Sequence, residues 1–123
     1  MGFPHHVHDN LIFKIIPNIQ GKQIFMNDYK LATYFCRTSY AKEGVCMYVH
    51  KSLNIESVDI ENYCNEKDLE ACATKLTLNS THICLITIYR APSGNFTFFI
   101  NNLDSIVVWL TVHCNSVWIR KTN

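Results

Sequence analysis

Several groups of residues in this sequence have side chains that could do chemistry, and the first is a run of histidines near the start. It reads His5-His6-Val7-His8-Asp9, and imidazole nitrogens suit zinc. The spacing lacks the i, i+4 pair of helical zinc motifs, so a cluster of surface histidines explains the run better. The sequence also has no Cys-x-x-Cys pair to build a thiolate site. We therefore assign no metal ligand.

The six cysteines are the second group, since an even number in a short chain can indicate a disulfide framework. The chain does not begin with the positive and then apolar segment of a secretory signal. Cys36, Cys46, Cys72 and Cys84 lie in apolar runs, where a free thiol behaves as a small apolar side chain. We expect reduced cysteines in an intracellular protein, nuclear or cytoplasmic, and keep a disulfide-stapled secreted domain as the last alternative.

The third group is the segment from Tyr89 to Asn95, which reads YRAPSGN. Tyr, Arg, Ser and Asn side chains all donate hydrogen bonds to phosphate oxygens in protein–DNA complexes. Each also has an ordinary structural explanation. Tyr89 could pack in a core, and Arg90 could support the loop or be solvated. Ser93 fits a turn, and Asn95 fits a helix N-cap.

The elements that position this segment follow from the hydrophobic pattern. Strands are predicted over Tyr29–Cys36 and Val45–Val49 as one hairpin, with Gly44 in a turn that needs positive φ. A second hairpin joins Leu69–Leu78 to His82–Tyr89 through Asn79-Ser80, and its continuous β-branched second strand should be central and buried. The period then becomes helical, with Phe98, Leu103, Ile106, Val107 and Leu110 near one face.

Composition and charge set limits on the class of protein. The 123 residues fit one domain, and a net charge of +1 neither supports nor excludes a nucleic-acid partner. The longest apolar stretch, Ile106 to Val112, is too short to span a bilayer, so we expect no membrane segment. Met1 to Ile19 has no clear periodicity, and the chain beyond Cys114 holds one apolar fragment.

An ordered set of blocks carries a resemblance to a known family. The blocks are Cys36-Arg37, then Glu43-Gly44-Val45-Cys46-Met47-Tyr48-Val49, then Ile86 to Asn95 (ITIYRAPSGN), with Phe99 and Leu103 following. Together they resemble the endonuclease domain of jockey-type non-LTR retrotransposons, in the endonuclease/exonuclease/phosphatase superfamily. The resemblance covers roughly residues 29–106. It implies a DNase I-like α/β fold, a two-sheet β-sandwich flanked by helices.

The resemblance also implies an activity and roles for residues. Members of this endonuclease family cleave DNA phosphodiesters with a divalent metal, usually Mg²⁺, to nick target DNA before reverse transcription. Tyr89 matches the family's tyrosine, whose hydroxyl approaches the scissile phosphate, and is the expected catalytic residue. Arg90, Ser93, Asn95 and Arg37 are the expected substrate-binding residues. Ser93 stands where many members carry asparagine.

Departures from the family pattern affect the expected activity. The place of a metal-binding glutamate reads Pro4, which cannot coordinate a cation. The motifs Gly-Asp-x-Asn and Ser-Asp-His, expected after the helix, do not occur in the sequence. We expect a single partial domain over 1–123 with poorly matched ends at 1–20 and 114–123, derived from a nuclease and impaired in cleavage. A domesticated binding or scaffold module is the alternative.

Overall fold

The computed structural model describes residues 11–16, 28–36 and 44–121. Its elements, in chain order, are β1 (Leu11–Ile16), β2 (Tyr29–Cys36), β3 (Gly44–His50), β4 (Asn54–Val58), a 3-10 helix η2 (Glu61–Tyr63), β5 (Glu70–Leu78), β6 (Thr81–Tyr89), α2 (Phe96–His113) and β7 (Ser116–Lys121). None of the described helices is long and apolar enough to cross a membrane.

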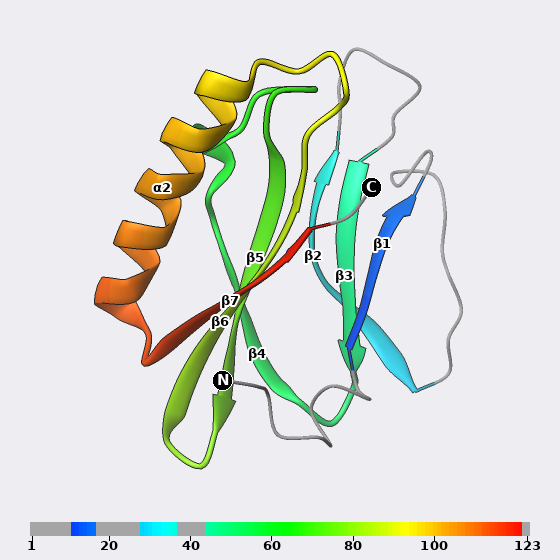
Figure 1. Cartoon of the computed structure of the whole chain (residues 1–123). Helices are drawn as coiled ribbons and strands as arrows, with labels where there is room; N and C mark the ends of the chain where they lie inside the picture. The colour runs from blue at the N-terminus through cyan, green and yellow to red at the C-terminus, as the bar shows by residue number, and fades with distance from the viewer. Residues whose placement is uncertain (1–10, 17–27, 37–43, 122–123) are drawn as a thin grey trace.

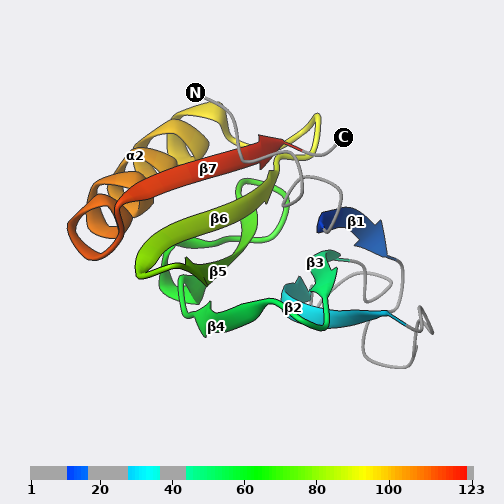
Figure 2. The same cartoon turned by 90° about the horizontal axis from the view of Figure 1, so that it is seen from below.

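The described elements form three layers (Figures 1 and 2). Helix α2 covers one face of a four-stranded sheet with the order β4-β5-β6-β7, and a three-stranded sheet, β1-β3-β2, lies against the other face. Every pairing among these strands is antiparallel except that of β6 with β7. These two strands run parallel, and helix α2 connects one to the other. The mixed α/β prediction with two sheets is therefore confirmed at this level.

Strand β6 is central because the chain supplies apolar side chains on both of its faces. Cys84, Ile86 and Ile88 pack with Phe99, Ile106 and Leu110 of the helix. The alternate residues Ile83 and Leu85 pack between the two sheets with Leu76, Met47 and Val49. The prediction of a buried, central strand at this place is confirmed.

The two predicted hairpins are present with nearly the predicted bounds. β2 pairs with β3, and β5 pairs with β6 through a turn whose residues Asn79 and Ser80 have φ values of 48° and 70°. Two consecutive positive φ values match the twist of the flanking strands, which is why asparagine suits this turn. The prediction for Gly44 is wrong, because Gly44 lies in β3 and no described glycine has positive φ.

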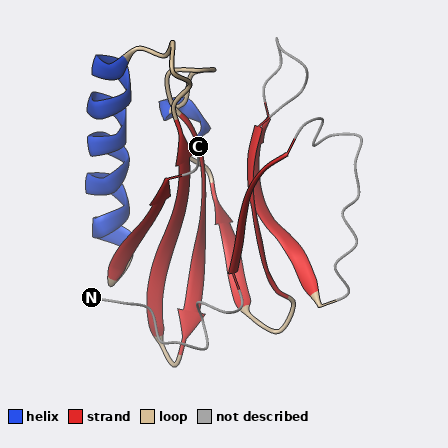
Figure 3. Ribbon diagram, turned by 45° about the vertical axis from the view of Figure 1, so that its right-hand side comes forward, coloured by secondary structure: helices blue, strands red, loops and turns tan. Residues whose placement is uncertain are grey.

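Three strands were not predicted. β1 lies in the segment taken to lack periodicity, β4 is a short edge strand, and β7 lies in the poorly matched end (Figure 3). β1 pairs with β3 from Leu11 to Ile16, and β7 pairs with β6 from Ser116 to Lys121. Both sheets are therefore wider than the hydrophobic pattern indicated.

The prediction that all cysteines are thiols is also wrong. Cys84 of β6 and Cys114, the C-cap residue of α2, form a disulfide with their Cα atoms 6.1 Å apart. Cys46, Cys64 and Cys72 are not part of a disulfide. The sequence did not indicate this pair because Cys84 lies in the most apolar strand, where a packed thiol was the simpler explanation.

Candidate functional site

Tyr89 is the last residue of β6 and faces the three-stranded sheet. The neighbouring Cys72 of β5 faces that sheet too, since its thiol lies 3.8 Å from the carbonyl oxygen of Val45 in β3. Cys72 pairs with Thr87, and Glu70 pairs with Tyr89, so all four side chains share one face of the four-stranded sheet. Tyr89 is half-buried there.

The space between the sheets is apolar at one end and polar at the other. Leu76, Ile83 and Leu85 fill it near the β5–β6 turn. Toward the other end the same face carries Glu70, Cys72, Thr87, Tyr89 and, on the adjacent strand β7, Arg120, which pairs with Thr87. We call these five residues the polar end.

Three members of the polar end are almost completely removed from solvent. Cys72 is 2% exposed, Glu70 1% and Thr87 0%. The Thr87 hydroxyl has no hydrogen-bond partner in the part of the chain that the structure describes. Buried hydroxyls without a partner are rare and often mark a place where a water, an ion or a ligand completes the network. The Thr87 hydroxyl is therefore a point where a water or another polar group could complete the network.

Glu70 anchors the turn that precedes β5. Its Oε2 accepts a hydrogen bond from the backbone N–H of Lys67 at 2.8 Å, and Lys67 has a φ of 71°. Left-handed backbone is unfavourable for lysine, and a buried carboxylate bonded to its amide helps to hold that conformation. No sequence pattern indicated this role, because it depends on the burial of an acidic residue at the start of a strand.

The loop after Tyr89 is fixed to the same turn. The N–H of Ala91 donates to the Lys67 carbonyl at 2.8 Å, and the N–H of Asn95 donates to Oδ1 of Asp68 at 2.7 Å. At Gly94 an added Cβ would lie 2.2 Å from the Lys67 carbonyl oxygen, so the two backbones touch there. This contact holds the loop that follows the expected catalytic residue in a single position.

Arg90 faces the helix, on the opposite side of the sheet from Tyr89, as strand alternation predicted. Its Nη1 donates to the Gly94 carbonyl at 3.1 Å, and its guanidinium carbon lies 5.4 Å from the Phe96 ring centroid and 5.9 Å from that of Phe99. A guanidinium over aromatic rings is stabilised by cation–π attraction. Of the alternatives for Arg90, these contacts favour support of the loop over contact with DNA.

Asn95 is the N-cap of α2, as predicted. Its side-chain oxygen accepts the N–H of Phe98 at 2.9 Å. Ser93 is exposed in the loop, and Arg37 lies outside the described residues, as do Pro4 and the N-terminal histidines. The structure thus brings Tyr89, Arg90, Ser93 and Asn95 into one loop region but gives Arg90 and Asn95 structural roles.

We expect Asn95→Ala to lower the free energy of unfolding by about 1 kcal/mol, since an N-cap side chain satisfies an otherwise unpaired helix N–H. Urea unfolding followed by circular dichroism measures the change. Asn101→Ala, an exposed position on the same helix, is the matched control and should change stability by less than about half as much. An equal effect of both substitutions would contradict the capping role.

Strand β7 brings further charge to the polar end. Its pairing places Arg120 beside Thr87, on the face of Tyr89, and Lys121 beside Ile88, on the opposite face that the helix covers; both cations are exposed. Trp118 packs between the sheets, so Arg120, two residues later, faces the same side. Sequence reasoning missed this pair because it depends on β7 lying parallel to β6.

The residues of the polar end do not fit the Mg²⁺ that the family resemblance implies. Mg²⁺ binds through carboxylates and water. The polar end has the carboxylate of Glu70, which already accepts the Lys67 amide, and on the same face of the sheet the cation Arg120. Within the described ranges no three histidine, cysteine or acidic side chains are grouped closely enough to hold a metal ion. We derive no step through a metal.

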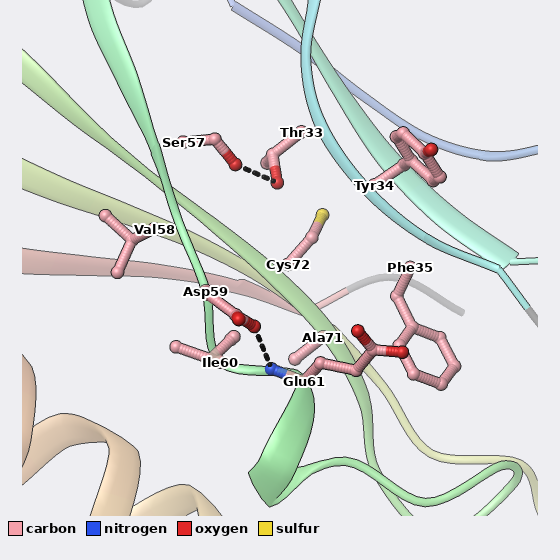
Figure 4. A pocket seen from close by; sticks show the side chains of 10 residues that line it. All are labelled: Thr33, Tyr34, Phe35, Ser57, Val58, Asp59, Ile60, Glu61, Ala71 and Cys72. Carbon is pink, nitrogen blue, oxygen red and sulfur yellow. Dashed lines mark hydrogen bonds between the residues drawn. The ribbon is translucent and has the colours of Figure 1, made fainter.

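A separate cavity of about 360 Å³ opens between the edge strands β2 and β4 (Figure 4). Its wall includes Thr33 and Ser57, whose hydroxyls are hydrogen-bonded at 3.2 Å, the carboxylates of Asp59 and Glu61, and the Cys72 thiol. Asp59 accepts the N–H of Glu61, and burial raises the pKa of the Cys72 thiol well above its usual value. The Thr33 and Ser57 hydroxyls and the Asp59 carboxylate therefore make hydrogen bonds to other groups of the cavity wall.

Cys64, near this cavity, gives a testable pH dependence. Burial raises the pKa of its thiol from 9.0 to about 11. The unfolded chain therefore loses this proton first, so the stabilising contribution is present below pH 9.0 and is lost as the pH rises to about 11. We expect the urea midpoint of the wild type to fall more over this range than that of Cys64→Ser. An equal fall of the urea midpoint in the two proteins would contradict the raised pKa of Cys64.

Comparisons with known proteins add no assignment. No known protein family matches the chain, and neither the search of curated proteins nor that of solved structures found a similar protein. Function must therefore be inferred from the residues and their arrangement.

Proposed function

We propose that the chain is part of a retroelement-derived domain of the endonuclease/exonuclease/phosphatase superfamily, with the DNase I-like fold. The parent activity is metal-dependent cleavage of DNA phosphodiesters, used to nick a target site before reverse transcription. In this chain the activity is impaired or absent. For such a domain we expect an intracellular compartment, nuclear or cytoplasmic, and the disulfide between Cys84 and Cys114 counts against it, because oxidising compartments favour such bonds.

The observation that carries the proposal is the position of Tyr89. It ends β6, a central strand of the four-stranded sheet, at the polar end of the space between the two sheets, and the loop after it is fixed to the turn before β5. The family resemblance gives a tyrosine at such a place the task of donating to a scissile phosphate. A helix and another strand follow the motif in both the family pattern and this fold.

The impairment is inferred from the strand after the helix. In the family that strand ends in Gly-Asp-x-Asn, and this motif does not occur in the sequence here. Residues that act together in a reaction also fail together, so loss of the metal carboxylate removes most of the rate.

A second candidate function is a binding module without catalysis. The cation Arg120, which lies on the same face of the sheet as Tyr89, favours it, because a guanidinium binds phosphate oxygens without any catalytic step. The two candidates share the fold and differ in whether any chemistry remains.

Nicking of supercoiled plasmid by purified protein tests the proposal. We expect no nicking with Mg²⁺ above the level seen with EDTA, together with a cooperative thermal unfolding transition. Robust nicking that is lost both in EDTA and in Tyr89→Ala would contradict the impairment while supporting the family. Nicking that survives Tyr89→Ala would contradict the role of Tyr89.

A further inference from the structure

The side of α2 that faces solvent is unusually apolar for a surface helix. Among the described elements, none lies over this side of the helix (Figures 1 and 2). The helix contains no lysine or arginine, and Asp104 is its one acidic residue. A surface helix normally carries charged and polar residues on its outer side, whereas a helix that is apolar on all sides is normally covered.

Every fourth residue along this side belongs to one row, which we call the outer ridge. In chain order its members are Phe96, Ile100, Asp104, Val108 and Val112. Successive members are turned by about 40° around the helix axis and are neighbours on the helix surface. The four apolar members expose between 44% and 76% of their surface. The ridge is therefore an exposed apolar row with a carboxylate at its midpoint.

We propose that the outer ridge binds an amphipathic helix of a partner protein, and that this helix carries a lysine or arginine within its apolar face, opposite Asp104. Rows of every fourth residue are the ridges that pack into the grooves of a second helix. A helix that docks in this way is held by apolar side chains at helical spacing. The exposed Trp109, one turn before Val112, widens the apolar surface at one end of the ridge.

The carboxylate of Asp104 indicates the charge of the partner. Asp104 is exposed, and its carboxylate makes no ion pair or hydrogen bond within the described ranges of the chain. An apolar helix laid over it would remove an unpaired charge from water, which is unfavourable. A cation opposite Asp104 offsets that cost and fixes the register of the bound helix.

The same carboxylate disfavours two other occupants of the outer ridge. A second copy packed symmetrically along the ridge would bring the two Asp104 carboxylates together at its midpoint, and like charges repel. A helix that lies on an anionic membrane is rich in lysine and arginine, and α2 has neither. The ridge is also separate from the proposed nuclease site, because α2 covers the face of the sheet opposite to that of Tyr89.

Two labelled synthetic peptides test the proposal by fluorescence anisotropy. Both are amphipathic leucine-rich helices as long as α2, and they differ only at the centre of the apolar face, which holds lysine in one and glutamate in the other. Asp104→Lys reverses the charge of the ridge, and Asp28→Lys makes the same change at another exposed position. Val108→Ser removes an apolar member, with the exposed Leu31→Ser as its control. Thermal unfolding of each variant shows that it folds.

We expect the wild type to bind the lysine peptide about tenfold more tightly than the glutamate peptide, since an opposite charge replaces a like one. Asp104→Lys should reverse this preference, whereas Asp28→Lys should keep it. Val108→Ser should weaken the binding of both peptides about tenfold, and Leu31→Ser should leave it unchanged.

Three results would overturn the inference and leave the proposed nuclease origin untouched. The first is equal binding of the two peptides by the wild type, or a preference that Asp104→Lys does not change. The second is no binding of either peptide. The third is that Val108→Ser abolishes either self-association in analytical ultracentrifugation or binding to phosphatidylcholine vesicles, while neither peptide binds. That result would assign the outer ridge to a second copy or to a membrane.

Discussion

Gly94→Ala is expected to lower the free energy of unfolding by about 3 kcal/mol, because backbone strain and broken hydrogen bonds combine at this position. The added Cβ would lie 2.2 Å from the Lys67 carbonyl oxygen and 3.1 Å from that of Ala91. Neither is the end of a flexible side chain, so the two loops must separate. Separation breaks the hydrogen bond from Ala91 to Lys67 and strains that from Asn95 to Asp68.

Chemical unfolding with urea measures this loss, and Ser93→Ala in the same loop is the matched control. Ser93 is exposed, so its substitution should change stability by less than about 0.5 kcal/mol. If Gly94→Ala were as mild as Ser93→Ala, the close contact between the two loops would be wrong. The loop after Tyr89 would then not be held in place by the turn before β5.

Reduction of the disulfide between Cys84 and Cys114 is expected to lower the free energy of unfolding by a similar amount. The bond closes a loop with a sequence separation of 30 residues. A cross-link that acts by restricting the unfolded chain contributes about 3 to 4 kcal/mol of stability for a loop of that length, through loop-closure entropy. The bond joins the central strand β6 to the end of α2, so it stabilises the connection that runs from β6 through the helix to β7.

Thermal unfolding with and without dithiothreitol measures the contribution. The double variant Cys84→Ala with Cys114→Ala should melt below the oxidised wild type and should show no further response to the reductant. Alkylation followed by mass spectrometry, before reduction, identifies which cysteines are thiols. Modification of all six without a reductant would contradict the disulfide.

The elements that could be predicted from the sequence are those whose pattern alone decides the structure. The β5–β6 hairpin has two long apolar strands and a turn that tolerates positive φ, so its bounds are correct within a residue. Helix α2 has an N-cap asparagine directly before a helical apolar pattern. In both cases local propensity and burial agree, which makes prediction from one sequence reliable.

The missed strands depend on neighbours rather than on their own pattern. β4 (Asn54–Val58) contains Ile55 and Val58 as its apolar residues and forms because β5 offers an edge to pair with. β7 (Ser116–Lys121) ends in three exposed residues and is placed by β6 and by the preceding helix. A short half-exposed segment carries too little apolar surface for its pairing to be visible in the sequence.

The candidate site was predicted where it depends on alternation and capping, and missed where it depends on tertiary burial. The opposite directions of Tyr89 and Arg90 follow from the period of a strand, and the capping role of Asn95 follows from its place before the helix. The burial of Glu70 and Thr87 follows only from the sheet that covers them. The arrival of Arg120 beside Thr87 requires the parallel crossover, which no local pattern encodes.

The parallel pairing of β6 with β7 also has a consequence for the order of folding. The β5–β6 hairpin joins Leu78 to Thr81 across two residues, whereas the first β7 pair joins Ile83 to Ser116 across the whole helix. Closing a long loop costs more chain entropy than closing a turn, so distant pairings form late. We therefore expect the hairpin and α2 to form first and β7 to dock last, which makes the edge that carries Arg120 and Lys121 the final part of the sheet to assemble.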